Sequence, residues 1–336
     1  MEYSLRRFQK VHKLGNDIYI GNMPPNARYI ENAPQFLSQL LQWLSFVKSD
    51  SEIIDYIRNI SNLSSKEASK LLKELIEKDI LIQDPKISDD RYSRHALYYN
   101  MMGINQEESQ KKLKSKKVAL VGMGGIGSNI AMNLVGAGIG EFLLVDGDTI
   151  ETSNLTRQFL YNEDEIGEFK VVAAKRNLKK LNSECKIQSV NSEISNKEEL
   201  AKMLAGTDFV ILSADSPSEI HDWMDYAANE DKFAYSNAGY IENFGVVGPL
   251  TIPNLTTQYH DYKYIGDLDK FSNNENEVNS NLNENYQAPS YGPLNTLVSS
   301  IQSNEVIRYF LGEDCRSKGT RLLIDSSNYS IVEEKF

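Results

Sequence analysis

The chain contains few cysteines: two among 336 residues, Cys185 and Cys315, which lie far apart in the sequence. Two distant cysteines give no disulfide framework, and this usage is typical of a reducing cytoplasm. The first residues, MEYSLRRFQK, lack the apolar core of a signal peptide. No apolar run reaches the length that spans a membrane. We therefore expect a soluble cytoplasmic protein that does not act at a membrane.

Positive charge is also scarce, because 36 lysines and arginines face 47 aspartates and glutamates, giving a formal net charge of −11. Nucleic acid binding requires a basic surface, so this balance argues against nucleic acid as a partner, although it allows a local basic pocket. The hydrophobic fraction of 40% and the charged fraction of 25% are those of an ordinary globular protein. A chain of this length forms one large domain or two ordinary ones.

Residues 1–88 have the pattern of a small separate unit. The stretch from Arg6 to Ile20 alternates loosely and is broken around Gly15, which predicts two strands joined by a turn. Three helical stretches and a closing strand at 80–82 follow, and in the third helix Ser64 and Glu67 have the capping-box spacing. This pattern is typical of a winged-helix-like module. Such a module has three possible roles: a scaffold, a DNA-binding unit, or a unit that pairs an extended peptide against a strand edge. The acidic composition disfavours DNA binding.

Residues 89–336 change to short apolar runs that alternate with helical periods. The runs are KVALVG, EFLLVDGD, IQSV, DFVILSAD and KFAYSNAG. This alternation predicts an α/β fold with a mostly parallel sheet and crossover helices. Residues 271–286 are rich in asparagine and glutamate and have too few apolar side chains to become ordered, so we expect a mobile loop there. The segment YGPLNTLVSSIQSNEVIRYFLG after it predicts a helix with Pro293 near its start.

A glycine-rich turn follows the run Lys117–Val121, with Gly122, Gly124 and Gly127 in the G-x-G-x-x-G pattern. These glycines allow a tight turn, a close approach of backbone to phosphate, and close packing of a helix on a strand. The helix that begins there offers free N–H groups to an anion. Asp146 ends the next apolar run, where an acid can hydrogen-bond a ribose hydroxyl. This context predicts a nucleotide site, and at this point it fits an NAD oxidoreductase as well as an ATP enzyme.

Two basic residues help to separate these possibilities. Asn154 and Arg157 are three apart and share a face if the segment is helical, and Lys170 follows near a second helix start. An intact dinucleotide has one pyrophosphate, which the helix N-terminus already satisfies. If Arg157 and Lys170 both face the site, they favour a triphosphate, because arginine clamps phosphate in a fork and lysine acts as a point charge. Otherwise both are solvated surface charges.

Asp215 ends the run DFVILSAD, and ligands gather at the carboxyl ends of strands in open parallel sheets. An acid at this position, near phosphates, is a natural magnesium ligand, because magnesium takes one or two carboxylates plus phosphate oxygens. The alternative is that Asp215 caps the next helix, since Ser216-Pro217 follows it.

The ordered motifs GMGGIG, VDGD, SNLTRQ, Lys170 and SAD resemble the adenylating domain shared by ThiF, MoeB and the ubiquitin-activating enzymes. The motifs RYSRH at 91–95 and NAGYIENFGVVGPL at 237–250 are similar to the branch that matures peptide antibiotics of the microcin C and pantocin A type. The likeness spans about residues 91–253. It implies a Rossmann-like, ThiF-type domain over 89–336, preceded over 1–88 by a peptide clamp that recognises a ribosomal precursor peptide.

By this resemblance the enzyme uses ATP and magnesium to adenylylate a peptide carboxylate, either the C-terminal one or a glutamate side chain. Asp146 would hold the ribose, Asp215 the metal, and Arg94 would enter the site from the partner subunit of a homodimer. The candidate catalytic residues are Arg157, Lys170, Asp215 and Arg94. The nucleotide is expected to contact Gly122, Gly124, Gly125, Gly127, Asp146, Asp148, Asn154, Arg157 and Lys170.

Two features depart from the wider family. Many of its members hold a structural zinc with two Cys-x-x-Cys pairs, whereas this chain has neither pair, so we expect no zinc. Its thioester-forming members need a catalytic cysteine in a crossover loop, and residues 251–286 contain none, which disfavours activation of a sulfur carrier or a ubiquitin-like protein. An inactive ThiF-like module that presents a peptide to a partner enzyme is the alternative from another class, although the retained Arg157, Lys170 and Asp215 disfavour it.

Overall fold

A computed structural model describes the chain except residues 23–26, 84–89, 260–288 and 336. The described chain forms two compact units, Met1–Glu107 and Glu108–Phe336. The predicted boundary at residue 88 falls within residues 84–89, and the predicted mobile loop at 271–286 also lies outside the described residues, so both stay predictions. Within the described chain, no helix combines the length and apolar character needed to cross a membrane.

The N-terminal unit, residues 1–107, combines helices with two small three-stranded sheets, and the winged-helix-like character predicted for residues 1–88 stays a prediction. Its elements are β1 (Glu2–Leu5), β2 (Val11–Leu14), β3 (Asp17–Ile20), β4 (Arg28–Ile30), α1 (Gln35–Trp43), β5 (Lys48–Ser49), α2 (Asp50–Ile60), α3 (Ser65–Glu77), β6 (Leu81–Gln83) and α4 (Ser93–Met101). The sheets have the orders β5-β1-β6 and β2-β3-β4. The hairpin β2–β3 turns at Gly15, whose φ of 59° suits glycine, so the predicted strand–turn–strand is confirmed.

A single apolar core holds the N-terminal unit together, and the predicted apolar face of α3 is part of it. Ala68, Leu72 and Leu75 are buried, and Leu71 and Ile76 pack beside them half-buried. The predicted capping box is also present, because Ser64 and Glu67 bond each other's backbone N–H groups. The cap fixes where α3 begins and thereby which of its side chains face the core.

The C-terminal unit, residues 108–336, is built on one large sheet with helices on both faces. After α5 (Gln106–Lys114), its elements are β7 (Lys117–Val121), α6 (Gly127–Ala137), β8 (Glu141–Val145), the 3-10 helices η1 (Thr152–Asn154) and η2 (Glu163–Glu165), α7 (Lys170–Leu181), β9 (Lys186–Val190), α8 (Lys197–Leu204), β10 (Phe209–Leu212), α9 (Ile220–Asp231), β11 (Ala234–Ile241), β12 (Phe244–Thr251), α11 (Gly292–Leu311), β13 (Thr320–Asp325) and β14 (Ile331–Lys335). The five apolar runs of the sequence are its strands β7 to β11.

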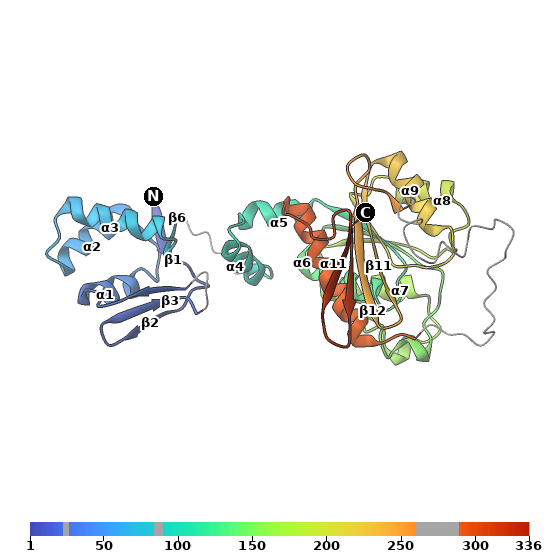
Figure 1. The fold of residues 1–336 in the computed structure, drawn as a ribbon, viewed down its shortest axis with the longest axis horizontal. Helices are drawn as coiled ribbons and strands as arrows, with labels where there is room; N and C mark the ends of the chain where they lie inside the picture. Colours follow the sequence, from blue (N-terminus) through green and yellow to red (C-terminus); the bar gives the residue numbers. More distant parts are fainter. Residues whose placement is uncertain (23–26, 84–89, 260–288, 336) are drawn as a thin grey trace. The chain divides into compact units, whose positions relative to one another are not determined.

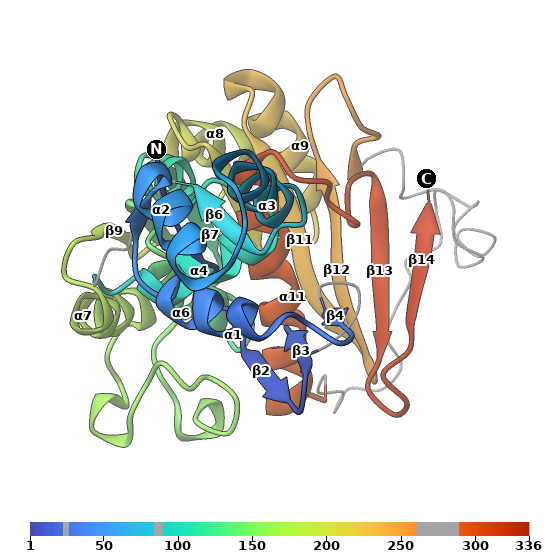
Figure 2. The same ribbon diagram turned by 90° about the vertical axis from the view of Figure 1, so that its left-hand side faces the viewer.

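The eight strands of this sheet have the order β14-β13-β12-β11-β10-β7-β8-β9. Strands β9, β8, β7, β10 and β11 run parallel, which confirms the predicted α/β class with a mostly parallel sheet. Strands β12 to β14 extend it antiparallel and lie side by side with β11 in Figure 2. These three strands are additional to the predicted runs. In β12, Gly245, Gly248 and Pro249 interrupt the pattern that would mark a strand.

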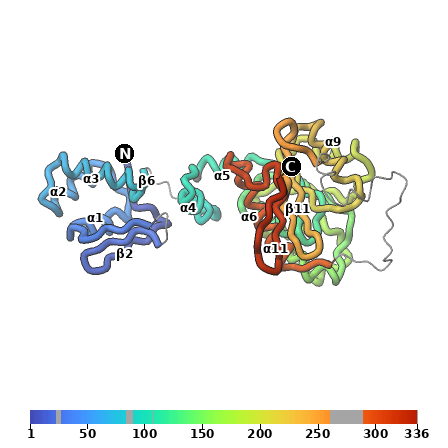
Figure 3. Tube along the Cα trace, viewed as in Figure 1, coloured from blue at the N-terminus to red at the C-terminus, as the bar shows by residue number. Residues whose placement is uncertain are grey.

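Helices α8 and α9 cover one face of the sheet, while α6 and α11 lie together against the other (Figures 1 and 3). On the α8–α9 side, Leu200 and Met224 are fully buried against the strands. The predicted helix after residue 290 is confirmed as α11, which packs along α6. Its Ser299 hydroxyl donates to the carbonyl of Ile126, just before α6, at 3.1 Å. This packing brings the first turn of α11 to the glycine-rich turn.

Candidate functional site

The glycine-rich turn after β7 is held by close contacts that exclude larger side chains at two positions. Gly122 has φ 95°, and a Cβ there would lie 2.8 Å from the backbone nitrogen of Ala214. A Cβ on Gly127 would overlap the carbonyl oxygen of Gly122. Gly124 differs, because the nearest atom to its Cβ position is 3.9 Å away. Gly122 and Gly127 therefore shape the turn, and Gly124 leaves room beside it for a ligand.

Asp146 is fixed against this turn by backbone groups. Its Oδ2 accepts a hydrogen bond from the N–H of Met123 at 2.6 Å, and its Oδ1 accepts one from Asp148 at 2.8 Å. The hydroxyl of Tyr161 donates to the carbonyl of Met123 at 2.9 Å. Burial, together with the carboxylates of Asp146, Glu165 and Asp148, raises the pKa of Tyr161 well above its ordinary value, so it stays a neutral donor. Each Asp146 oxygen keeps a lone pair that could accept a ribose hydroxyl.

Lys170 is the first residue of α7, and its charge is held next to the same turn. Only 7% of its side chain is exposed, and Nζ lies 2.6 Å from Oδ2 of Asp148, whose side chain is 70% exposed. The Lys170 N–H also bonds the Asp148 carbonyl at 2.9 Å. A buried ammonium needs a partner, and here the partner is an exposed carboxylate that water or a ligand can reach. A ligand can therefore reach Asp148 and replace it as the partner of the Lys170 ammonium.

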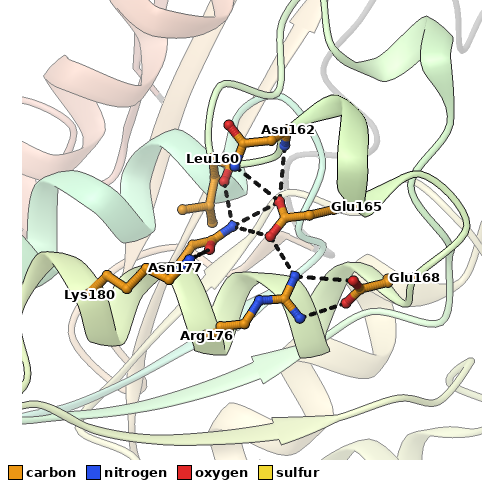
Figure 4. Close-up of polar contacts among 7 residues, drawn as sticks. All are labelled: Leu160, Asn162, Glu165, Glu168, Arg176, Asn177 and Lys180. Atoms are coloured by element: carbon orange, nitrogen blue, oxygen red, sulfur yellow. Dashed lines mark hydrogen bonds and ion pairs between the residues drawn. The ribbon is translucent and has the colours of Figure 1, made fainter.

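The segment between β8 and α7, residues 146–169, carries Asn154 and Arg157 and is locked by a buried carboxylate (Figure 4). Glu165 is 3% exposed and receives hydrogen bonds from Arg176 at 2.5 Å and from Asn177 at 2.8 Å. Arg176 also pairs with Glu168 at 2.7 Å. Burial acts to raise the pKa of Glu165, but these bonds and the Asn162 N–H together lower it below its usual range. The locked segment fixes the path of the backbone between Arg157 and Lys170.

Asn154 uses its side chain within its own turn. It is 7% exposed, and its Oδ1 accepts the N–H of Glu151 at 3.1 Å. Its carbonyl accepts the N–H of Arg157 at 3.0 Å, so the two residues lie on one short helical turn, as the spacing predicts. In this arrangement Asn154 orients the backbone that carries Arg157. Direct contact of Asn154 with a nucleotide stays a prediction.

A cavity of about 430 Å³ opens beside the glycine-rich turn. Gly124, Gly125, Arg157 and Asp215 line it together with Arg321, so the fold brings the glycine-rich turn, two arginines and one carboxylate to the same cavity. Arg157 is half-buried and donates through Nη1 to the carbonyl of Ser153 at 2.8 Å. Asp215 is exposed in the loop between β10 and α9. The alternative role of Asp215 as a helix cap is wrong, because α9 begins at Ile220 with Glu219 before it.

Asp146, Asp148, Asn154 and Lys170 are not among the residues that line this cavity. Asp146 and the cavity residue Gly124 nevertheless flank Met123, so the cavity and the Asp146 region share the glycine-rich turn. Arg94 lies in α4 of the N-terminal unit. The predicted residues of the C-terminal unit thus form two adjoining groups, one at the cavity and one around Asp146.

Four further polar residues of the cavity wall carry no predicted role: Gln158, His221, Asn237 and Asn295. Each has a buried side-chain nitrogen or oxygen without a hydrogen-bond partner, and Asn237 has two. Native proteins rarely leave such atoms unpaired, so this wall is built to bind water or a polar ligand. Gln158 ends the motif SNLTRQ, directly after Arg157, and Asn237 is the first residue of the motif NAGYIENFGVVGPL. Nothing in the sequence marks His221 or Asn295.

Asp215 fits a magnesium ion that arrives with phosphate. In the described part of the chain, no three histidine, cysteine, aspartate or glutamate side chains cluster as a metal site would require. Magnesium bound to a nucleotide needs less, because one or two carboxylates and the phosphate oxygens suffice. An exposed carboxylate on the cavity that also holds Arg157 and the start of α6 meets this requirement.

A model of the ThiF family matches residues 92–335 of this chain. The molybdopterin-synthase adenylyltransferase of Haemophilus influenzae is 29% identical over 245 residues, which is 73% of this chain and 93% of that protein. The adenylyltransferase and sulfurtransferase UBA4 of Candida glabrata is 34% identical over 193 residues, which is 57% of this chain. That match spans 42% of UBA4, so the chain corresponds to about two fifths of that relative.

Solved structures of E. coli MccB resemble the chain over its whole length. The complex of MccB with ATP has a TM-score of 0.79 at 28% identity and covers 100% of this chain and 97% of that one. The structure of the microcin C7 biosynthetic enzyme MccB with N-formylated MccA has a TM-score of 0.81 at the same identity and coverage.

Proposed function

This chain belongs to the ThiF family, as its motifs indicate, and from that premise we propose that it adenylylates a carboxylate of a ribosomally made precursor peptide. The family and the mixed α/β fold support an adenylyltransferase that uses ATP. The peptide substrate, magnesium, the homodimer, the cytoplasmic location and the part in antibiotic biosynthesis belong to the proposal.

The observation that carries the proposal is the cavity beside the glycine-rich turn. Gly124, Gly125 and Ile126, which directly precede α6, line it together with Arg157 and Asp215. A triphosphate needs donors and positive charge, and its magnesium needs a carboxylate. A dinucleotide coenzyme would offer no further phosphate for Arg157 and no magnesium ion for Asp215 to bind. The arrangement therefore supports ATP over NAD.

We assign the residues as follows. Asp146, pinned beside the turn, holds the ribose, and Gly124 lets the backbone approach the phosphates. Arg157 clamps phosphate in a fork, Lys170 adds a point charge, and Asp148 releases Lys170 when phosphate arrives. Gly122 and Gly127 keep the turn tight, Gly125 continues it, and Asn154 orients Arg157.

The chemistry needs positioning more than a covalent nucleophile. A carboxylate resists attack because its charge repels nucleophiles and oxide is a poor leaving group. Its oxygen attacks the α-phosphorus of ATP, the bond to pyrophosphate breaks, and an acyl adenylate forms. Arg157 and Lys170 stabilise the charge that develops on the phosphates. Magnesium, held by Asp215 and phosphate oxygens, would neutralise further charge.

The peptide class rests on two supports. MccB is 28% identical across nearly the full length of both chains, and it has been solved with MccA. In the N-terminal unit of this chain, β2 and β4 are the outer strands of a small sheet, and most of their residues are exposed, so this sheet could pair with an extended peptide. We assign precursor recognition to this unit. We also infer a homodimer in which Arg94 of one subunit completes the site of the other.

The test is ATP–pyrophosphate exchange with magnesium and a panel of short synthetic peptides. The panel includes MccA and the products of any very short reading frames beside the gene. Peptide-dependent exchange is expected, and both Arg157→Ala and Asp215→Ala should abolish it. Absence of AMP, ADP and pyrophosphate with every peptide would refute the enzyme assignment. Weak, magnesium-independent ATP binding without exchange would favour an inactive module instead.

A second candidate, activation of a sulfur carrier, is favoured by the sequence likeness to UBA4 and molybdopterin-synthase adenylyltransferase. The cysteines disfavour it. Cys185 and Cys315 are 2% and 7% exposed, and none of the residues described around the cavity is a cysteine. Burial, with the nearby Glu305 carboxylate, raises the pKa of Cys315 to about 11, so its thiol is a poor nucleophile. Exchange stimulated by a sulfur carrier protein and by no peptide would select this candidate.

A further inference from the structure

His221 lies in the first turn of α9 and lines the cavity together with Asp215 and Asn237. Its ring stacks on Tyr259, with ring centroids 4.2 Å apart and planes 17° from parallel. Its Nδ1 is buried and has no hydrogen-bond partner. An imidazole that is fixed by stacking but keeps an unpaired nitrogen is prepared for a polar ligand.

Tyr259, on which the His221 ring stacks, is itself held in place by hydrogen bonding. The backbone N–H of Tyr259 donates to Oδ1 of Asp225 at 3.3 Å, and Asp225 is 5% exposed. The same Asp225 oxygen accepts the hydroxyl of the buried Tyr235. The backbone of Tyr259 is therefore held by a buried polar group. The imidazole rests on a fixed ring, which favours one orientation in the cavity wall.

His221 is neutral at physiological pH. Burial lowers the pKa of His221, while the Asn237 amide and the carboxylates of Asp222 and Asp215 oppose this shift without cancelling it. These groups come from the elements around the ring: Asp222 from α9, Asp215 from the preceding loop, and Asn237 from β11. A neutral imidazole has one nitrogen that donates and one that accepts. It can therefore accept a proton from a bound group.

Carboxylate activation has two halves with different needs. In the first half the carboxylate is already ionised, so the attack on ATP requires no base. In the second half an N–H or O–H group attacks the acyl carbon, and its proton must leave. The residues assigned to ATP binding are otherwise engaged: Arg157 and Lys170 are cations, Asp146 and Asp148 are paired with donors, and Asp215 is assigned to magnesium.

We propose that His221 serves the second half, as the base that receives the proton of the attacking N–H or O–H group. The nucleophile forms its bond to the acyl carbon, and the bond between that carbon and the AMP oxygen breaks. AMP leaves with the electron pair, and the proton passes to the imidazole. This inference rests on the proposed function, because it requires an activated carboxylate in the same cavity.

The test separates the two halves in the full-length protein. The probe is the peptide of the panel above that gives the highest wild-type exchange. His221→Phe keeps a ring on Tyr259 and removes both nitrogens. His221→Asn removes the ring but places an acceptor oxygen near the position of Nδ1. Glu230→Gln, at an exposed position of the same helix, is the control. Thermal unfolding checks that each variant folds.

Two rates are compared for each variant: ATP–pyrophosphate exchange, and AMP release with formation of the modified peptide. In His221→Phe exchange should persist, while AMP release falls about 100-fold or more, the usual contribution of a general base. His221→Asn should show a similar loss of AMP release, because an amide oxygen accepts a hydrogen bond but does not take up a proton at neutral pH, and Glu230→Gln should match the wild type. A role in packing alone would reduce both rates together.

Four results would overturn the inference and leave the proposed function standing. They are equal loss of exchange and AMP release in His221→Phe, full activity in His221→Phe, AMP release at the wild-type rate in His221→Asn, and wild-type exchange without AMP release. If His221→Phe fails to fold, the split between exchange and AMP release in His221→Asn decides the matter. Absence of exchange in the wild type would instead remove the proposed function, and the inference with it.

Discussion

At the scale of single residues, the glycines that follow β7 differ in what surrounds them. This difference separates glycines that the fold requires from a glycine that ATP binding requires. Gly124 has open space at its Cβ position, with the nearest atom 3.9 Å away, and it lines the cavity. We predict that Gly124→Ala leaves the free energy of unfolding nearly unchanged. It should weaken ATP binding about tenfold or more, which is about 1.4 kcal/mol, because the methyl group occupies the space that a phosphate needs. Calorimetric titration with magnesium ATP measures this effect.

Gly136, in the last turn of α6, provides the matched control. No atom lies within 4 Å of its Cβ position, so Gly136→Ala should stabilise the protein by about 0.5–1 kcal/mol without changing ATP affinity. Gly127→Ala should instead destabilise the fold, since its methyl group would overlap the Gly122 carbonyl. Unaltered ATP binding in Gly124→Ala would show that the phosphates do not approach this backbone.

Arg157 is the residue on which the phosphate assignment depends most. Arg157→Ala should lower the rate of ATP–pyrophosphate exchange by about 100-fold or more, as loss of one preorganised donor does elsewhere. Thermal unfolding should change little, because the guanidinium is half-buried and its described bond is a single one to the Ser153 carbonyl. Arg157→Lys should recover little, because lysine keeps the charge but loses the fork. Exchange at the wild-type rate in Arg157→Ala would remove this residue from the site.

Motif residues could be assigned from the sequence, whereas the rest of the cavity wall could not. Gly124, Arg157 and Asp215 occur in ordered motifs, and the fold does bring them to one cavity. His221 and Asn295 come from different helices separated by 74 positions in the sequence, and no spacing rule connects them. What singles them out is an unpaired buried atom, and that property exists only after the chain has folded.

At the scale of elements, the path from β8 to α7 depends on Glu165. Glu165→Gln keeps the size of the side chain but removes the charge that Arg176 and Asn177 bind. We predict a loss of about 1–3 kcal/mol in the free energy of unfolding at pH 7, as expected for hydrogen bonds to a buried charged group. Urea unfolding measures this loss. Glu163→Gln, at an exposed position in the same 3-10 helix, should have little effect.

The pH dependence of this effect has a definite sign. The pKa of Glu165 is lower in the folded protein than the ordinary 4.5, so the folded state favours the carboxylate. Its stabilisation is complete above pH 4.5 and is lost as the pH falls through the folded pKa. The advantage of the wild type over Glu165→Gln should therefore shrink below about pH 4.5. An advantage that stays constant or grows in acid would contradict the assigned charge state.

The elements with a regular period could be predicted, and those shaped by contacts could not. Strands β7, β8 and β10 and most of β11 are apolar runs buried on both faces, whereas β9 is largely exposed or half-buried. A capping box marks the start of α3. Strand β12 contains Gly245, whose Cβ would lie against Val298 of α11, so the glycine reflects helix packing and breaks the strand pattern. Strand β13 alternates buried and half-buried residues, but its six residues are too short a signal when read alone.

At the scale of the whole molecule, the inferred homodimer can be tested by complementation. Arg94 belongs to the N-terminal unit and Asp215 to the C-terminal unit. If Arg94 acts in the partner's site, a dimer of one Arg94→Ala chain and one Asp215→Ala chain contains one intact site. Mixing the two inactive variants should restore up to about a quarter of wild-type exchange, on the statistics of random C2 assembly with one working site in half of the dimers.

The control is the same mixture with formation of mixed dimers verified by mass spectrometry. Mixed dimers that form and show no exchange would mean that each subunit works alone. Activity in the Arg94→Ala chain by itself would remove Arg94 from the chemistry.

The central claim is that a substrate carboxylate attacks the α-phosphorus of ATP. The direct measurement uses a peptide whose carboxylates carry oxygen-18, with magnesium ATP and hydroxylamine to consume the acyl adenylate. Mass spectrometry of the released nucleotide follows the label. The account predicts AMP that carries one oxygen-18 atom, because the oxygen that joined the phosphorus stays with it. Unlabelled AMP, or ADP with the label in inorganic phosphate, would contradict it.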